Sequence, residues 1–203
     1  MKPGKQSGTV RERLLRSANE LFYREGIHVI GIDRILSHAA VAKASLYGTF
    51  KNKDELVRAY LEDRARAVQT RLGERIAKAP DGRAAILAVF DDFVDRVNGG
   101  GYCGCPFIRA SAEGEEGPSA AREVSSQFRR WRLGLFTGLA KDAGIENPEE
   151  LAVQLCLIYD GASVSVAMDG ENTAAKVARK TAELLLEGPA ASSAPRKKSR
   201  RKS

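Results

Sequence analysis

Residues 31–56 of this 203-residue chain read GIDRILSHAAVAKASLYGTFKNKDEL. Apolar side chains recur at spacings of three and four over 32–39, which predicts a short helix with one buried face. A second short helix is predicted over 43–50, and only residues 40–42 separate the two. Two helices joined this closely have the proportions of a helix-turn-helix, whose second helix can enter the major groove of DNA.

The second predicted helix carries side chains that suit a DNA groove. They are small or hydrogen-bonding, so they can reach base edges without steric bulk. Lys51 and Lys53 follow at once, beside the start of a longer helix near Asn52, and are placed for phosphate oxygens. The predicted DNA-binding residues are Lys43, Ala44, Ser45, Tyr47, Gly48, Thr49 and Lys53. Spacing alone does not distinguish a DNA-binding motif from an ordinary pair of short helices with solvent-exposed lysines.

Helical periodicity extends outward from this motif in both directions. Further helices are predicted over 10–26, 52–79, 83–97, 106–112, 119–143, 148–168 and 173–187. No stretch alternates as a half-buried strand would, so we predict an all-α protein of about nine helices. A three-helix head over 9–57, with the motif at 31–50, precedes a helical body over 58–187. Residues 188–203 lack large apolar side chains and are predicted to be a disordered basic tail.

The net charge of +7 is unevenly distributed. Residues 1–80 carry +7, residues 81–189 carry −6 and residues 190–203 carry +6. A basic head beside an acidic body indicates that the head meets a polyanion while the body does something else. The tail either adds sequence-independent phosphate contacts or serves as a solubilising end.

The cysteines and the polar N-terminus indicate a reducing compartment. Cys103, Cys105 and Cys156 are odd in number, no signal peptide is evident, and no apolar run approaches the roughly 18 residues of a membrane span. We therefore expect a cytoplasmic protein with no membrane partner. The only histidines, His28 and His38, lie in the head, so we expect no metal site and no cofactor. Buried structural thiols are predicted, with a redox sensor as the alternative.

Residues 10–57 resemble the N-terminal DNA-binding domain of TetR-family transcriptional regulators. The most specific part is a string formed by Leu46, Tyr47, Phe50, Lys53 and Leu56 at the end of the helix pair. The resemblance implies a nine- or ten-helix fold, a homodimer on a double-stranded DNA operator, and repression relieved by an unknown small molecule. It makes 58–187 the expected ligand-binding and dimerisation domain.

The resemblance also implies roles for individual residues. Tyr47, Ser45 and Lys53 would contact phosphates, while the other four predicted residues would face bases or the groove wall. The chain departs from the family pattern at Ile30-Gly31, where many members carry Thr or Ser, and at Thr49, where His is common. Both departures concern base preference rather than fold.

The last two long helices are the expected dimer surface, packed as a four-helix bundle with their partners. The candidate contacts are Leu155, Ile158, Ala162, Val166, Val177, Thr181, Leu184 and Leu185. A stripe that faces the core of one subunit has the same periodicity, so that alternative stays open.

An apolar effector pocket is expected between the body helices. Its candidate residues are Phe90, Phe107, Phe128, Trp131, Leu135 and Tyr159, which could equally be plain core. The arginines of the run 129–132 could meet an acidic ligand or be solvated.

These features predict a ligand-responsive DNA-binding repressor that recognises a pseudo-palindromic operator. An enzyme is not expected, because no nucleophile elbow, Walker loop or dinucleotide fingerprint occurs. Two alternatives remain, a thiol-redox-responsive regulator of the same fold and a sequence-nonspecific DNA-coating protein.

Overall fold

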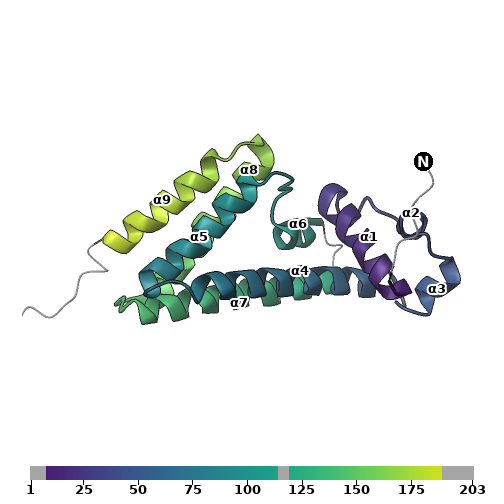
Figure 1. Ribbon diagram of the computed structural model, residues 1–203, viewed down its shortest axis with the longest axis horizontal. Coiled ribbons are helices and arrows are strands. Elements are labelled where there is room, and N and C mark those ends of the chain that lie inside the picture. The colour runs from purple at the N-terminus through teal and green to yellow at the C-terminus, as the bar shows by residue number, and fades with distance from the viewer. Residues whose placement is uncertain (1–7, 114–118, 189–203) are drawn as a thin grey trace, which may run out of the picture.

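The computed structural model describes residues 8–113 and 119–188, and these form helices joined by short connections (Figure 1). The described residues contain nine helices and no strand, which confirms the predicted all-α class. The helices are α1 (Val10–Glu25), α2 (Ile32–Ala39), α3 (Lys43–Tyr47), α4 (Lys53–Ile76), α5 (Gly82–Asn98), α6 (Pro106–Glu113), α7 (Ala120–Asp142), α8 (Pro148–Asp169) and α9 (Thr173–Glu187). The predicted tail lies, apart from Gly188, outside the described residues.

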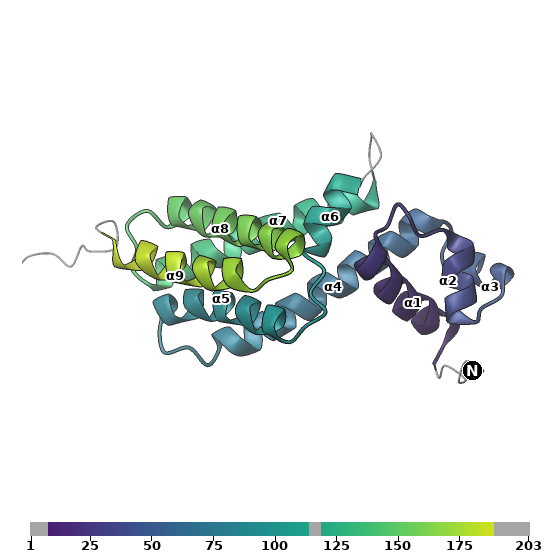
Figure 2. The same cartoon turned by 90° about the horizontal axis from the view of Figure 1, so that it is seen from above.

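Helices α1, α2 and α3 form a head at one end of an elongated molecule (Figures 1 and 2). A capping box starts α1: the Thr9 hydroxyl accepts the Glu12 N–H, and the Glu12 carboxylate accepts the Thr9 N–H. Leu14 and Phe22 of α1 share one core with Leu46 of α3. Each such buried side chain contributes about 1.5–3 kcal/mol, so this core holds the short helices in place.

Helix α4 connects the head to the rest of the molecule and contributes to two cores. The Asn52 side chain caps its start by accepting the Glu55 N–H at 2.8 Å. Tyr60, near the start, is buried in the head core, whereas Leu72 is buried in the core of the body. Val68 lies between them and packs against both.

The body consists of α5, α7, α8 and α9, which pack against one another, while α6 lies between this bundle and the head (Figures 1 and 2). Phe90, Phe93 and Phe136 are fully buried at its centre. The rings of Phe90 and Phe136 stack with centroids 5.9 Å apart. This aromatic centre fixes α5 against α7.

Helix α3 ends at Tyr47 rather than at the predicted residue 50. The Phe50 N–H donates to the Leu46 carbonyl at 2.7 Å, and the Thr49 hydroxyl donates to the Ser45 carbonyl at 2.7 Å. Phe50 is buried in the head core, so the chain must turn there to reach α4. The end of the helix is therefore set by a tertiary contact.

Helix α8 is, within the described part of the chain, the one helix long and apolar enough to cross a membrane by length and composition. This corrects the expectation that no apolar segment approaches that length. Leu151, Leu155 and Tyr159 of α8 are buried in the body core, where the helix packs against α7 and α9. A core helix that is also apolar on its outer face has the same length and composition as a membrane-spanning helix.

Gly82, the first residue of α5, offers a test of the close packing of α5 on α7. A Cβ atom there would lie 2.5 Å from the Ala143 nitrogen and 2.6 Å from the Leu139 carbonyl oxygen. Gly82→Ala should therefore lower the free energy of unfolding by about 1–3 kcal/mol, as measured by urea denaturation. Gly134→Ala is the control, because a Cβ there meets nothing within 4 Å and should stabilise α7 by up to about 1 kcal/mol. Equal stabilities would contradict the packing.

Candidate nucleic-acid interface and internal cavity

The connection between α2 and α3 is a tight turn. Ala40 has φ 52°, in the left-handed region, and is the one non-glycine residue with positive φ in the described ranges. The Val41 N–H donates to the Leu36 carbonyl at 3.1 Å. Ile35 of α2 and Leu46 of α3 are fully buried on either side, which fixes the angle between the two helices.

Helix α3 buries only Leu46 and presents the rest of its surface outward. Its large aromatic residue, Tyr47, is 53% exposed. Packing within the chain does not account for an aromatic side chain at this exposed position. The surface is therefore available to a partner.

The structure brings the seven predicted DNA-binding residues together on α3, the turn after it and the first residue of α4. Exposed positions are Lys43, Ala44, Tyr47 and Gly48, and half-buried ones are Ser45, Thr49 and Lys53. The Lys43 ammonium lies 3.4 Å from the Asp33 carboxylate, an exposed pair that a phosphate or base could displace. The Thr49 hydroxyl already donates to its own helix.

A cavity of about 100 Å³ lies where α1, α4, α5, α6, α7 and α8 meet. Four predicted pocket residues line it, namely Phe107, Phe128, Trp131 and Tyr159. The other two do not, because Phe90 is fully buried behind Tyr159 and Leu135 packs against the body core. Arg132, one of the arginines expected either to meet an acidic ligand or to be solvated, also lines it. Residues absent from the prediction complete the wall, chiefly Tyr23, Tyr102, Arg64, Arg71 and Arg96.

Aromatic rings form one side of this cavity. Phe107 and Phe128 stack with centroids 3.7 Å apart, and Trp131 lies 5.2 Å from Phe128. On another side, the Tyr102 hydroxyl is hydrogen-bonded to Ser163 at 2.6 Å. Burial raises the pKa of Tyr102 and of Tyr159, so both phenols are neutral at physiological pH.

Cys156 is buried and Cys105 is half-buried. Burial raises the pKa of the Cys105 and Cys156 thiols, against the opposing effect of the Arg132 charge. Both therefore stay as thiols rather than the reactive thiolates at neutral pH. Cys103 is half-buried, and its thiol donates to the Gly101 carbonyl at 3.5 Å. This environment favours structural cysteines over a redox sensor.

Helices α8 and α9 expose large apolar side chains on their outer face. These are Val153, Leu157, Val164 and Met168 of α8, with Val177 and Leu184 of α9. The four α8 residues fall within one narrow stripe when projected at 100° per residue. Such a stripe has no partner within the described chain and is typical of a protein-protein interface.

The predicted dimer residues divide into three groups by burial. Leu155, Ala162 and Val166 are buried in the core of their own subunit, so they cannot supply new buried surface to a second copy. Val177 and Leu184 are exposed, and the other three are half-buried. The outer stripe of α8 thus replaces the inner one as the candidate interface.

Comparison with known proteins identifies the family to which this chain belongs. A sequence profile described as "Bacterial regulatory proteins, tetR family" matches residues 14–60. The chain is 30% identical to a TetR-family transcriptional regulator from Streptomyces coelicolor, whose crystal structure superimposes with a TM-score of 0.82 over 88% of this chain and 94% of that one. This chain belongs to the TetR family of transcriptional regulators. Proteins of this family regulate transcription by binding DNA.

Other relatives agree with this TetR-family assignment. A regulator from Streptomyces avermitilis is 30% identical and has a TM-score of 0.80 over 89% of this chain and 97% of that chain. The HTH-type transcriptional activator FasR of Mycolicibacterium smegmatis is 27% identical over 145 residues, which are 67% of this chain and 61% of the relative. The match to FasR therefore spans less than two thirds of that protein's length.

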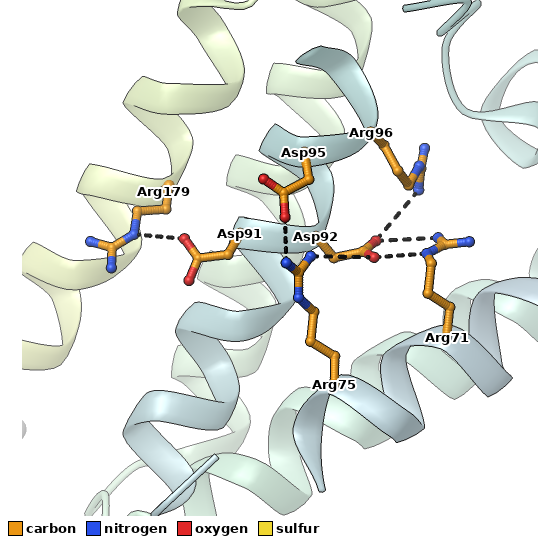
Figure 3. Close-up of polar contacts among 7 residues, drawn as sticks. All are labelled: Arg71, Arg75, Asp91, Asp92, Asp95, Arg96 and Arg179. Atoms are coloured by element: carbon orange, nitrogen blue, oxygen red, sulfur yellow. Dashed lines mark hydrogen bonds and ion pairs between the residues drawn. The ribbon is translucent and has the colours of Figure 1, made fainter. Parts of the chain in front are cut away.

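In this TetR-family chain, a cluster of arginines around Asp92 holds α4 to α5 (Figure 3). The Asp92 side chain is only 4% exposed. Arg71 donates to both of its carboxylate oxygens, at 2.7 and 3.2 Å, while Arg75 and Arg96 approach to 3.6 and 4.0 Å. Arg75 also donates to Asp95. A buried carboxylate surrounded by cations fixes the second half of α4.

A second polar contact ties α6 to the head. Glu113 accepts the Ile27 N–H at 2.7 Å, the His28 N–H at 3.1 Å and the Arg109 Nε–H at 2.6 Å. Burial alone would raise the pKa of Glu113, but these donors together lower it, so the group stays a carboxylate. Gly26 has φ 106°, and a Cβ there would lie 2.6 Å from the Glu113 carboxylate. The contact therefore depends on glycine at position 26.

Replacing Asp92 should weaken the attachment of α4 far more than replacing its neighbour Asp95. Asp92→Ala leaves three partly buried guanidiniums without their shared carboxylate and should cost about 2 kcal/mol or more of stability. Asp95→Ala is the matched control, because Asp95 is 61% exposed and such pairs contribute at most about 1 kcal/mol. Thermal and urea unfolding of both variants provide the comparison, and equal losses would argue against Asp92 as the centre of the cluster.

Proposed function

We propose that this protein is a homodimeric repressor that binds a pseudo-palindromic operator and leaves it when a small molecule occupies the cavity. Residues 9–57 would be the DNA-binding part, and residues 58–187 the effector-binding and dimerising part, acting in the cytoplasm. The observation that carries the proposal is the outward α3 surface with Tyr47 53% exposed.

The proposed docking places α3 in the major groove. The Tyr47 hydroxyl and the Lys53 ammonium donate to phosphates on the groove edge, assisted by the Ser45 hydroxyl and by the backbone N–H groups at the start of α4. The Asn52 cap, which accepts the Glu55 N–H at 2.8 Å, supports this because it fixes the start of α4 directly after α3. Bases or the groove wall face Lys43, Ala44, Gly48 and Thr49.

Dimerisation through α8 and α9 would give the two heads their spacing. The outer stripe of α8, with Leu157 59% exposed, supplies apolar area, and Gly161 beside it permits close approach of a partner helix. In a symmetric dimer the same stripe serves both subunits. Two recognition helices held about 34 Å apart read half-sites on one face of the DNA.

Effector control would act through α4 and α6. Both helices contribute side chains to the cavity, among them Arg64 and Phe107, and both also contact the head. A ligand that fits only one arrangement of these walls shifts the population between DNA-competent and incompetent states. The Glu113 contact supports this route, since it joins α6 directly to the α1–α2 turn.

The DNA-binding proposal is tested by first selecting bound sequences from a random DNA pool and footprinting them. Tyr47→Phe and Lys53→Ala should each weaken binding to every sequence, about tenfold for Tyr47→Phe, because a hydrogen bond to a charged acceptor contributes about 1.5 kcal/mol. Lys43→Ala should instead alter which sequences are selected. Lys141→Ala, on the body, is the control.

Two outcomes would contradict this docking. Wild-type affinity of the Tyr47 and Lys53 variants would exclude their phosphate contacts. Selection that yields no preferred sequence would instead indicate the DNA-coating alternative.

The dimer proposal is tested by placing a charge in the outer stripe. Leu157→Glu would bury an unpaired carboxylate at the interface and should convert the dimer to monomers in sedimentation velocity. Val29→Glu is the control, since Val29 is 71% exposed but lies on the head, away from α8. A Leu157 variant that remains dimeric would place the interface elsewhere.

A further inference from the structure

The wall of the cavity is rich in positive charge. It contains Arg64, Arg71, Arg96 and Arg132, and no acidic residue of the described ranges lines it. Asp92 and Asp160 pair with arginines of the wall but each is shared, Asp92 among three arginines and Asp160 between two. Cations that are removed from water without matching counter-charge favour an anionic ligand.

Arg64 is the least compensated of these cations. Its guanidinium lies 4.0 Å from the centre of the Tyr23 ring, and Nη2 donates to the Asn19 carbonyl at 3.3 Å. Its Nε is buried without a hydrogen-bond partner, and it forms no ion pair with a carboxylate of the described chain. A ring face and a carbonyl attract a cation but do not neutralise it.

Arg96 and Arg132 add two further incompletely paired groups. The nearest carboxylate contact of Arg96 is 4.0 Å, to an Asp92 that Arg71 already holds in two hydrogen bonds. The Arg132 side chain is 6% exposed, and its Nη2 donates to Asp160, but its Nε is buried without a partner. Its guanidinium lies 4.9 Å from the Tyr159 ring centre.

The remaining wall and the volume define the body of the ligand. The stacked Phe107–Phe128 pair and the adjacent Trp131 offer flat apolar surfaces. An apolar cavity of about 150 Å³ accepts one benzene ring, so this cavity of about 100 Å³ must widen to hold a single ring and excludes a larger ligand. We propose that the cavity binds a single-ring aromatic carboxylate, with its carboxylate at Arg64 and Arg96 and its ring near Trp131.

This inference rests on the proposed function, because it names the chemical class of the effector. The test uses the full-length protein and the fluorescence of Trp131, the only tryptophan of the chain. Benzoate and phenylacetate should change that fluorescence saturably. Benzamide and phenylacetamide have the same shape without the charge, and should bind at least about tenfold more weakly.

Two variants test which cations recognise the charge. Arg64→Gln and Arg96→Gln should each weaken binding of the acids by about tenfold or more, while leaving the affinity of the amides unchanged. Arg66→Gln is the matched control, since Arg66 lies on the same helix but is 61% exposed. If Arg64→Gln loses its cooperative unfolding transition, the Arg96→Gln variant alone tests the role of these cations. In that variant Asp92 still pairs with Arg71 and Arg75.

Three results would overturn the inference: no saturable response to either acid, equal affinity for acids and amides, or unchanged acid affinity in the folded variants. Binding of the selected operator is measured in parallel with and without benzoate. If no acid binds but the operator is still bound specifically, the ligand class is wrong and the regulator proposal stands. If benzoate binds without changing operator affinity, the ligand class stands and the proposed effector response fails.

Discussion

The continuity of α4 constrains the other contacts of the molecule, because one helix supplies buried side chains to both cores. Tyr60 anchors its first half in the head, and Leu72 anchors its second half in the body. The shared carboxylate of Asp92 then fixes the second half against α5. Since one helix spans both cores, the proposed effector response would pass a displacement of its cavity-lining middle on to the head.

Most of the helical layout could be predicted from the sequence because its signals are local. The Thr9–Glu12 capping box and the Asn52 cap, for example, each join residues only three positions apart at the start of a helix. The end of α3 could not be predicted in this way. Gly48 keeps right-handed helical angles, so local sequence permits the helix to continue, and only the burial of Phe50 in the head core turns the chain away.

The cavity and the outer apolar stripe were less predictable. Aromatic residues at helical spacing mark core and pocket alike, which is why Phe90 and Leu135 were grouped with the true lining residues. Arginine is usually exposed, and nothing near Arg132 in the sequence indicates that Asp160 accompanies it into the interior. Apolar side chains occur on every face of α8. The periodicity of its sequence therefore cannot distinguish buried Leu155 from exposed Leu157.

The tight turn at Ala40 has a consequence for how control and recognition are divided. With Val41 bonded to Leu36 and with Ile35 and Leu46 fully buried, α3 cannot change its angle to α2 without breaking the head core. Any movement that originates in the body must therefore carry the head as one piece. In the proposed response, an effector would therefore alter how tightly the operator is held, while the choice of bases would stay the same in both states.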